Sequence, residues 1–223
     1  MPIVVAFISQ KGGVGKSTLA RALASVGAHG GLSVTLADLD QQQRTAMNWS
    51  GRRSPRDNSN LQVKLFAGID EALQSEGEAD LMVVDAPGRT NRTTLEIAKR
   101  AHLIVQPSGP GVDDLHPAIL LFHELAAAGI PKAKLAIALC RTAGEAEEAA
   151  ARAYIAEAGY AVLAGSMPER GAYREALNAG RAPTETTEPA LNDRVDALMD
   201  ALLATVMREL KAPTAPRQKG TAA

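Results

Sequence analysis

The chain of 223 residues is 46% hydrophobic and 22% charged, which excludes a collagen-like, low-complexity or disordered protein and favours one large domain. Its 24 lysines and arginines nearly balance 25 aspartates and glutamates, so any DNA binding would need a local basic face rather than bulk charge. The single cysteine, Cys140, fits a reducing compartment and excludes an internal disulfide or a single-chain iron–sulfur cluster. Since no apolar run approaches about 20 residues and no export signal is present, we expect a cytoplasmic protein.

Short apolar runs alternate with stretches of helical spacing. We expect strands at residues 3–9, 33–36, 62–66, 81–84, 103–105 and 135–139. Helices are expected at residues 16–28, 41–49, 68–74, 93–100, 117–128, 145–158, 171–178 and 188–210. Because the strand runs are apolar at consecutive residues, both faces of each strand should be buried. The pattern predicts an α/β fold in which helices cover both faces of a mostly parallel sheet, giving three α/β/α layers.

Residues 1–211 are expected to form a single domain. Residues 212–223 contain two prolines and no large apolar side chain, which is typical of a disordered basic tail. Residues 50–60 combine glycine, proline and cationic residues and are expected to form an exposed loop. The cationic residues of that loop are Arg52, Arg53 and Arg56.

A glycine-rich turn joins the first strand to the first helix in the sequence KGGVGKST, residues 11–18. Its glycines, Gly12, Gly13 and Gly15, allow backbone N–H groups to surround phosphate oxygens, next to the positive end of the following helix. In such a loop Lys16 pairs with the β- and γ-phosphates, Ser17 gives its hydroxyl to Mg²⁺ and Thr18 reaches the α-phosphate. A plain strand-to-helix turn would not require these residues in this register, so we expect a site for ATP and Mg²⁺.

The first glycine of the common phosphate-loop pattern is replaced by Gln10, and a second lysine, Lys11, follows it. With KGGVGKST the chain resembles the ParA/MinD family of deviant P-loop ATPases, and most resembles its small ParF-like partition proteins. The resemblance covers nearly the whole folded chain. It implies that Lys11 crosses a face-to-face homodimer to phosphates held by the partner subunit, which would link nucleotide to dimer state. The nucleotide-binding residues implied are Lys11, Gly12, Gly13, Val14, Gly15, Lys16, Ser17 and Thr18, with Lys11 and Lys16 also catalytic.

Two aspartates follow the second strand, where a carboxylate points into the crevice that binds ligands in open α/β sheets. The run Asp38-Leu39-Asp40-Gln41 resembles the next landmark of the family, although Gln41 replaces its usual proline. We expect Asp40 to orient the attacking water as a catalytic residue and Asp38 to lie near hydrated Mg²⁺. The alternative, that these carboxylates merely cap the following helix, stays open.

The apolar strand at residues 81–84 ends in Asp85, the Walker B arrangement, and Asp85 is expected to hold Mg²⁺ through water. Pro87 and Gly88 then form a turn suited to sensing the γ-phosphate. A capped strand end is the simpler interpretation of Asp85. Together with Ser17 and Asp38, Asp85 completes the expected metal residues.

The remaining site residues come from the resemblance. It implies adenine contacts from Arg141 and Pro168, and it puts Asp114 at the acidic position of a proline-rich loop. His29, His102, His116 and His123 show no metal-ligand spacing, so ordinary surface or packing roles are expected for them.

The resemblance further implies that the ATP-bound dimer coats nucleoid DNA nonspecifically. A ParB-like or other cargo-adaptor protein would then stimulate hydrolysis and release. The candidate DNA-binding residues are Arg170, Arg174, Arg181, Arg194, Arg208 and Lys211, with Arg217 and Lys219 in the tail; each taken singly can equally be a solvated charge. No residue selects among plasmid, chromosome, carboxysome, chemoreceptor cluster and conjugation complex as cargo.

Three alternatives remain. A MinD-like ATPase would reach a membrane through a C-terminal amphipathic helix, but residues 212–223 have no apolar face, so no membrane partner is expected. A metabolic enzyme of the dethiobiotin synthetase type shares the fold, and Lys11 argues against it. A nonenzymatic ATP-gated scaffold would differ by its low turnover in the presence of a partner.

Overall fold

The computed structural model describes residues 2–54, 60–75, 79–88 and 91–211. One sheet has the strand order β3-β2-β4-β1-β5-β6-β7, and a short eighth strand pairs with β6. All pairings between the described strands are parallel, as predicted. The strands are β1 (Ile3–Phe7), β2 (Val34–Asp38), β3 (Leu61–Leu65), β4 (Leu81–Asp85), β5 (Leu103–Ser108), β6 (Leu135–Thr142), β7 (Ala161–Val162) and β8 (Met167–Pro168).

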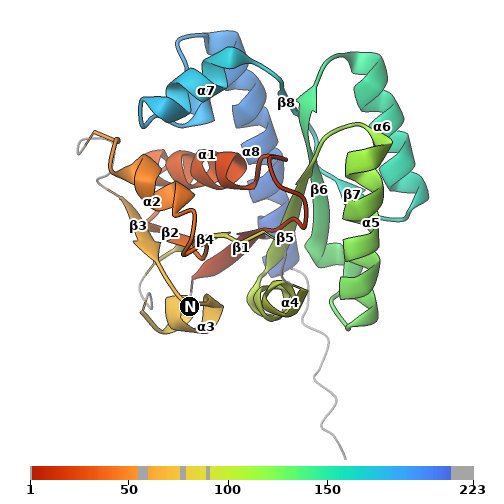
Figure 1. Ribbon diagram of the computed structural model, residues 1–223, viewed down its shortest axis with the longest axis horizontal. Helices are drawn as coiled ribbons and strands as arrows, with labels where there is room; N and C mark the ends of the chain where they lie inside the picture. Colours follow the sequence, from red (N-terminus) through yellow and green to blue (C-terminus); the bar gives the residue numbers. More distant parts are fainter. Residues whose placement is uncertain (1, 55–59, 76–78, 89–90, 212–223) are drawn as a thin grey trace, which may run out of the picture.

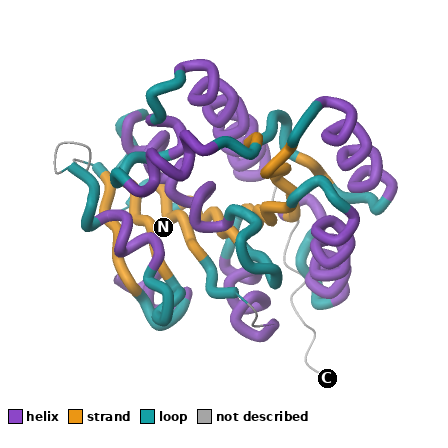
Figure 2. The backbone as a smooth tube through the Cα atoms, turned by 45° about the horizontal axis from the view of Figure 1, so that its top comes forward, coloured by secondary structure: helices purple, strands orange, loops and turns teal. Residues whose placement is uncertain are grey.

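Helices cover both faces of the sheet, which confirms the three-layer α/β architecture (Figures 1 and 2). One face carries α1 (Lys16–His29), α2 (Thr45–Ser50), α7 (Gly171–Asn178) and α8 (Pro189–Lys211). The other carries α3 (Ile69–Ser75), α4 (Asn91–Arg100), α5 (Val112–Ala127) and α6 (Glu145–Glu157). Two 3₁₀ turns, at Lys132–Lys134 and Pro183–Glu185, complete the regular elements of the described residues.

The central strand β1 shows why consecutive apolar residues predicted this arrangement. Val5 and Phe7 belong to the core beneath α1, whereas Val4, Ala6 and Ile8 belong to the core on the opposite face. Successive strand side chains point to opposite faces, and in β1 both directions lead into a helix layer.

The last helix packs as its periodicity indicates. Its apolar stripe is buried against the body at Leu191, Val195, Leu198, Leu202 and Val206. The charged residues Asp193, Arg194 and Asp200 are exposed. Among the described residues, no helix is long and apolar enough to cross a membrane. Residues 212–223 lie outside the described part, so the basic tail stays a prediction.

Two helix starts differ from the prediction by four or more residues. The helix expected from residue 41 begins at Thr45, because Asp40 accepts hydrogen bonds from the backbone N–H groups of Gln42 and Gln43 and Arg44 takes a left-handed φ of 48°. Helix α5 begins before its proline, at Val112. Pro117 therefore lies inside the helix and leaves the i−4 carbonyl without its usual N–H donor.

The expectation of an exposed loop at residues 50–60 is wrong for Arg53, which is 6% exposed. Its two terminal nitrogens donate to the two carboxylate oxygens of Glu185, at 2.8 and 2.7 Å. The guanidinium also lies 5.0 Å from the centre of the Trp49 ring. A charge paired in a bidentate manner can be buried, and no local sequence signal reveals a partner 132 residues away. Arg56 lies outside the described residues.

Candidate functional site

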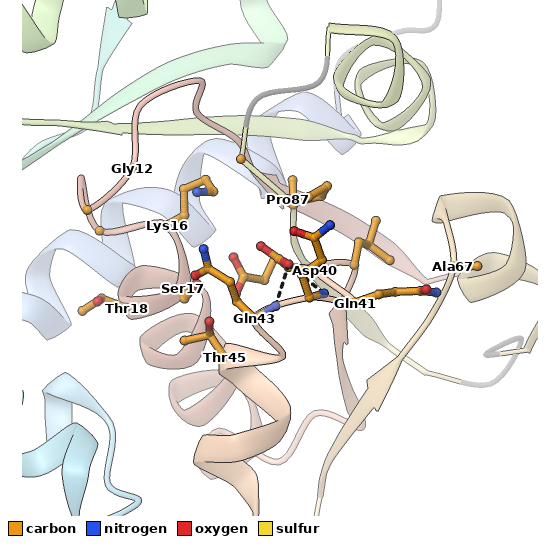
Figure 3. Close-up of a pocket in the computed structure, with 17 residues that line it drawn as sticks. Gly12, Lys16, Ser17, Thr18, Asp40, Gln41, Gln43, Thr45, Ala67 and Pro87 are labelled. Carbon is orange, nitrogen blue, oxygen red and sulfur yellow. Dashed lines mark hydrogen bonds between the residues drawn. The ribbon is translucent and has the colours of Figure 1, made fainter.

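A cavity of about 900 Å³ opens at the carboxyl edge of the sheet. Strands β1, β4 and β2 are neighbours there, so the loops that follow them meet at one place. Figure 3 shows Lys16 and Ser17 on one side of the cavity, from the glycine loop and the start of α1, and Asp40 and Pro87 on the other. The sequence-predicted residues that line it are Gly12, Gly13, Gly15, Lys16, Ser17, Thr18, Asp40, Asp85, Pro87 and Gly88.

The glycine loop requires glycine at defined positions. Gly13 and Gly15 have φ values of 74° and 110°, a region that residues with a Cβ rarely adopt. A Cβ on Gly15 would also lie 3.3 Å from Cys140 Sγ on β6. Gly15 is the N-cap of α1 and has no side chain that could accept a hydrogen bond. The first backbone N–H groups of the helix are therefore not capped by a side chain and remain available to a ligand in the cavity. The side chain of Val14 is buried, so Val14 can contact a phosphate only through its backbone N–H.

Asp85 ends β4 and is almost completely buried at the cavity wall. Burial raises its pKa to about 6; a hydrogen bond with Ser17 and the charges of Lys16 and Arg21 oppose that rise, while the charge of Asp38 adds to it. Its Oδ1 has no hydrogen-bond partner in the described structure. An orphaned carboxylate oxygen next to a serine hydroxyl fits the ligand preference of Mg²⁺.

Asp38, which is expected near hydrated Mg²⁺, makes backbone contacts in this structure. Its Oδ1 accepts from the backbone N–H of Asp40 at 3.0 Å, and its Oδ2 accepts from those of Ala46 and Met47 at 2.9 and 3.2 Å. The side chain is fully buried behind the cavity and is not among its lining residues. Oδ2 thus caps the start of α2, and Oδ1 holds the turn at Asp40, which fits the capping alternative. A place for Asp38 near hydrated Mg²⁺ stays a prediction.

Asp40 does line the cavity, held by a turn of its own. Its Oδ1 accepts from the N–H groups of Gln42 and Gln43 at 3.1 and 2.9 Å, drawn as dashed lines in Figure 3. The turn fixes the direction of the carboxylate and uses one of its oxygens. A carboxylate positioned in this way can orient a water molecule.

Lys11 folds back onto its own chain. Its Nζ contacts Asp114 Oδ1 and donates to the backbone carbonyl of Asp113 at 3.2 Å, while the side chain stays 46% exposed. That carbonyl is the one left without a helical donor by Pro117. Asp114 Oδ2 accepts a further bond from Arg141 Nη2 at 2.9 Å. In this chain Lys11 therefore has an acidic partner on its own subunit.

A second cavity, of about 240 Å³, adjoins the glycine loop. It is lined by Gly13, Gly15 and Thr18 together with the predicted adenine residues Arg141 and Pro168. The structure thus brings Arg141 and Pro168 beside the glycine loop, and Met167–Pro168 is the short strand β8, which the sequence did not predict. Two residues are too few for a periodicity to reveal a strand.

The candidate DNA-binding residues do not share one cavity. Arg170 and Arg174 line the second cavity, and Arg174 pairs with Glu169 at 2.9 Å. Arg194 and Arg208 are exposed on α8, and the backbone carbonyl of Arg181 accepts a bond from Trp49 Nε1. The side chain of Lys211 and the residues Arg217 and Lys219 lie outside the described part.

The histidines have partners other than a metal site. His102 Nδ1 accepts a bond from Val4 N, and His123 and His116 contact tyrosine hydroxyls. Within residues 2–54, 60–75, 79–88 and 91–211, no group of three or more His, Cys, Asp or Glu side chains could hold a metal ion. A cation at Asp85 would therefore depend on few protein ligands, with water and phosphate oxygens supplying the rest, as is usual for Mg²⁺.

Sequence reasoning missed several lining residues. The main cavity also uses Gln43, Thr45 and Ala67, and the second uses Glu169, Tyr173 and Leu177. The positions of Gln43, Thr45 and Ala67 after β2 and β3 could have been derived from the expected topology, since the carboxyl ends of parallel strands meet. Their residue types alone carry no signal.

The CbiA family model, described as the CobQ/CobB/MinD/ParA nucleotide binding domain, matches residues 5–184. Among solved structures, the cell division ATPase MinD of Pyrococcus furiosus is 16% identical, with a TM-score of 0.73 over 92% of this chain and 99% of that one. The ATP complex of a Cyanothece McdA variant is 18% identical, with a TM-score of 0.70 over 90% and 96% of the two chains. MinD of Pyrococcus horikoshii, complexed with Mg-ADP, is 15% identical, with a TM-score of 0.70 over 95% and 100%.

At these identities the likeness concerns the fold. No curated protein matches the chain in sequence.

Proposed function

Because the chain belongs to the CobQ/CobB/MinD/ParA nucleotide-binding domain family, a family of P-loop ATPases, we propose that it is a ParA-type ATPase. In this proposal ATP closes a homodimer, the dimer binds DNA nonspecifically, and a ParB-like or other cargo-adaptor protein stimulates hydrolysis. The protein would then act in the cytoplasm on the nucleoid. The ParF-like character expected from the sequence is part of this proposal.

The observation that carries the proposal is the composition of the main cavity. The glycine loop supplies backbone N–H groups and Lys16 for a triphosphate, and two carboxylates, Asp40 and Asp85, line the same cavity. Phosphoryl transfer depends on positioning and charge stabilisation, and this cavity offers both. The glycine loop and Lys16 would hold the phosphates, and Asp40 would orient the water in line with the γ-phosphate.

Magnesium would be held by Ser17 and, through water, by Asp85; when bound it neutralises charge that develops on the β- and γ-phosphate oxygens. The Asp85 carboxylate is well suited to this task, because the orphaned Oδ1 gains a partner. MinD of Pyrococcus horikoshii, which has a similar fold, is complexed with Mg-ADP, and this supports a nucleotide with Mg²⁺ as the ligand of this cavity.

Lys11 carries the dimer part of the proposal. Its present partner, Asp114, bears one negative charge, whereas a triphosphate on a facing subunit bears several. Lys11 would therefore exchange a weaker partner for a stronger one when two nucleotide-bound subunits meet. Closure depends on this difference and not on the whole strength of the new contact.

Light scattering after size exclusion tests this part, with Mg²⁺ and a nonhydrolysable ATP analogue. We expect the mass to double from 23.3 kDa in the wild type and to stay monomeric in Lys11→Ala, which should retain nucleotide. Lys16→Ala should lose nucleotide binding and dimerisation together. A wild type that remains monomeric with the analogue would refute the dimer.

Retention on DNA tests the second part. We expect ATP-dependent binding that weakens steeply with salt, since several phosphates would be neutralised. Equal retention of the apo, ADP and ATP forms would reject ATP-gated DNA binding. ATP-dependent retention on anionic vesicles instead of DNA would favour the MinD-like alternative.

A further inference from the structure

A third cavity, of about 390 Å³, lies between α1, α2 and α7, on the face of the sheet where Figure 1 shows these helices close together. Three arginines line it: Arg21 from α1, Arg52 from the segment after α2, and Arg174 from α7. The amide side chains of Gln43 and Asn48 line it as well. No carboxylate is among the lining residues, so the walls are rich in hydrogen-bond donors and carry positive charge.

Arg21 is the unusual member of this set. It is only 5% exposed, and its Nε and Nη2 atoms have no hydrogen-bond partner in the described structure. Burial lowers its pKa to about 10; Asp85 and Asp38 act on it electrostatically in the opposite direction, but it forms no ion pair within the part of the chain that the structure describes. A buried charged donor without a partner costs stability, and such a cost is commonly retained where a ligand supplies the missing bonds.

The surroundings hold Arg21 in this position. Its guanidinium lies 5.8 Å from the centre of the Trp49 ring, whose indole N–H is tied to the Arg181 carbonyl at 3.0 Å. Arg52 donates from Nη1 to the carbonyl of Asn48 at 2.9 Å, which fixes the rim. The donors of the cavity are thus held in place before any ligand arrives, and this lowers the ordering cost of binding.

We propose that this cavity is a binding site for a small phosphate-bearing ligand, separate from the nucleotide cavity. The buried Nε and Nη2 of Arg21 have no partner among the described residues, so its positive charge has no adjacent counter-charge there. A phosphate group in the cavity would supply that negative charge, and its acceptor oxygens suit the exposed guanidinium of Arg174. A small anion can reach a side chain that is 5% exposed, whereas a duplex backbone would remain at the rim. The volume accommodates the phosphate together with a sugar-sized group.

The third cavity shares lining residues with the main cavity. Gln43 and Thr45 line both this cavity and the main one, and Gln43 also donates its backbone N–H to the catalytic candidate Asp40. A ligand that contacts Gln43 from the third cavity acts on the same turn that directs Asp40. This link rests on the proposed function, whereas the binding site itself does not.

The protein contains its own probe, because Trp49 is the single tryptophan and stacks near Arg21. We would titrate the nucleotide-free full chain with inorganic phosphate and, separately, with ribose 5-phosphate, at constant ionic strength, and follow Trp49 emission. The wild type should show a saturable change. Ribose 5-phosphate binding more tightly would assign the site to phosphate esters, and equal or weaker binding would assign it to free phosphate; either result supports the proposal.

Arg21→Met should weaken the apparent affinity at least about tenfold, since the buried positive charge that attracts the phosphate is lost. This variant keeps an unbranched side chain against Trp49 and removes an unpaired buried charge, so its Tm should equal or exceed that of the wild type. Arg174→Gln, at an exposed position, should weaken binding severalfold. Arg100→Gln is the matched control, because that arginine pairs with Asp70 on the other face of the sheet and its substitution should leave binding unchanged.

Lys16→Ala separates this site from the glycine loop. The phosphate response should persist in Lys16→Ala even if nucleotide binding is lost, so that failure of the proposed function and failure of this site are distinguishable. A response lost in Lys16→Ala but retained in Arg21→Met would place the phosphate in the glycine loop and overturn the proposal. A wild type without a saturable response, or one that responds only to duplex DNA, would also overturn it.

Discussion

Substituting Asp85 by asparagine should stabilise the nucleotide-free protein while impairing its chemistry. Burial raises the pKa of Asp85 from the ordinary 3.8 to about 6, so the folded state binds the proton more tightly than the unfolded state. Stability therefore falls as pH rises between these two values, and above them the ionised carboxylate costs about 3 kcal/mol, at about 1.4 kcal/mol per pH unit. The side chain of an asparagine at this position would be neutral at every pH and would escape this cost.

Urea unfolding in the presence of a chelator measures the effect. We expect Asp85→Asn to raise the free energy of unfolding by about 3 kcal/mol at pH 7.5 and by only about 1 kcal/mol at pH 4.5, where most wild-type Asp85 is already protonated. Asp193→Asn, an exposed position on α8, should change it by less than about 0.5 kcal/mol at either pH. ATP turnover of Asp85→Asn should fall, because the amide is a poor partner for hydrated Mg²⁺.

A gain of equal size at both pH values would show that packing and not ionisation is responsible. A loss of stability at pH 7.5 would show that the carboxylate is satisfied in the folded protein, and the reasoning from its orphaned oxygen would fail.

Three further outcomes can be measured. Asp40→Asn keeps an acceptor for the turn that holds residue 40 but removes the negative charge, so ATP binding should persist while turnover falls about 100-fold or more; normal turnover would remove the catalytic assignment. Gly180→Ala should cost about 2–5 kcal/mol in unfolding experiments, because its Cβ would clash with the backbone carbonyl of Arg52, whereas Gly129→Ala, with a similar φ and open space, should cost about 1–2; equal costs would contradict the close approach. Glu185→Gln should cost about 3 kcal/mol by removing the negative charge that faces the buried guanidinium of Arg53. Although burial alone raises the pKa of Glu185, the Arg53 hydrogen bonds bring it below its usual value, so this contribution should be lost as pH falls through the pKa of Glu185, and a pH-independent cost would contradict it.

The sequence predicted those features whose cause is local. The glycine loop was accessible because its residues are contiguous and each has its own role in one turn. The sheet was accessible because β1 is apolar at every position, and Asp85 because it directly follows a buried strand. These signals depend on neighbours within a few residues.

Other features depend on contacts between distant segments. One oxygen of Asp38 accepts from N–H groups eight and nine residues later, at the start of a helix that was predicted to begin four residues earlier. Arg53 and Arg21 are cations in buried positions, and their burial follows from Glu185 and Trp49, which no spacing rule connects to them. The third cavity was therefore invisible in the sequence.

The carboxylate of Asp114 is shared between two cations, Lys11 through Oδ1 and Arg141 through Oδ2. If the lysine departs, the whole of that counter-charge passes to the arginine, which also stands at the wall of the second cavity. The Asp114–Arg141 ion pair is then strengthened when Lys11 leaves Asp114. Asp114 therefore couples the ion pair of Arg141, the predicted adenine residue, to the release of Lys11.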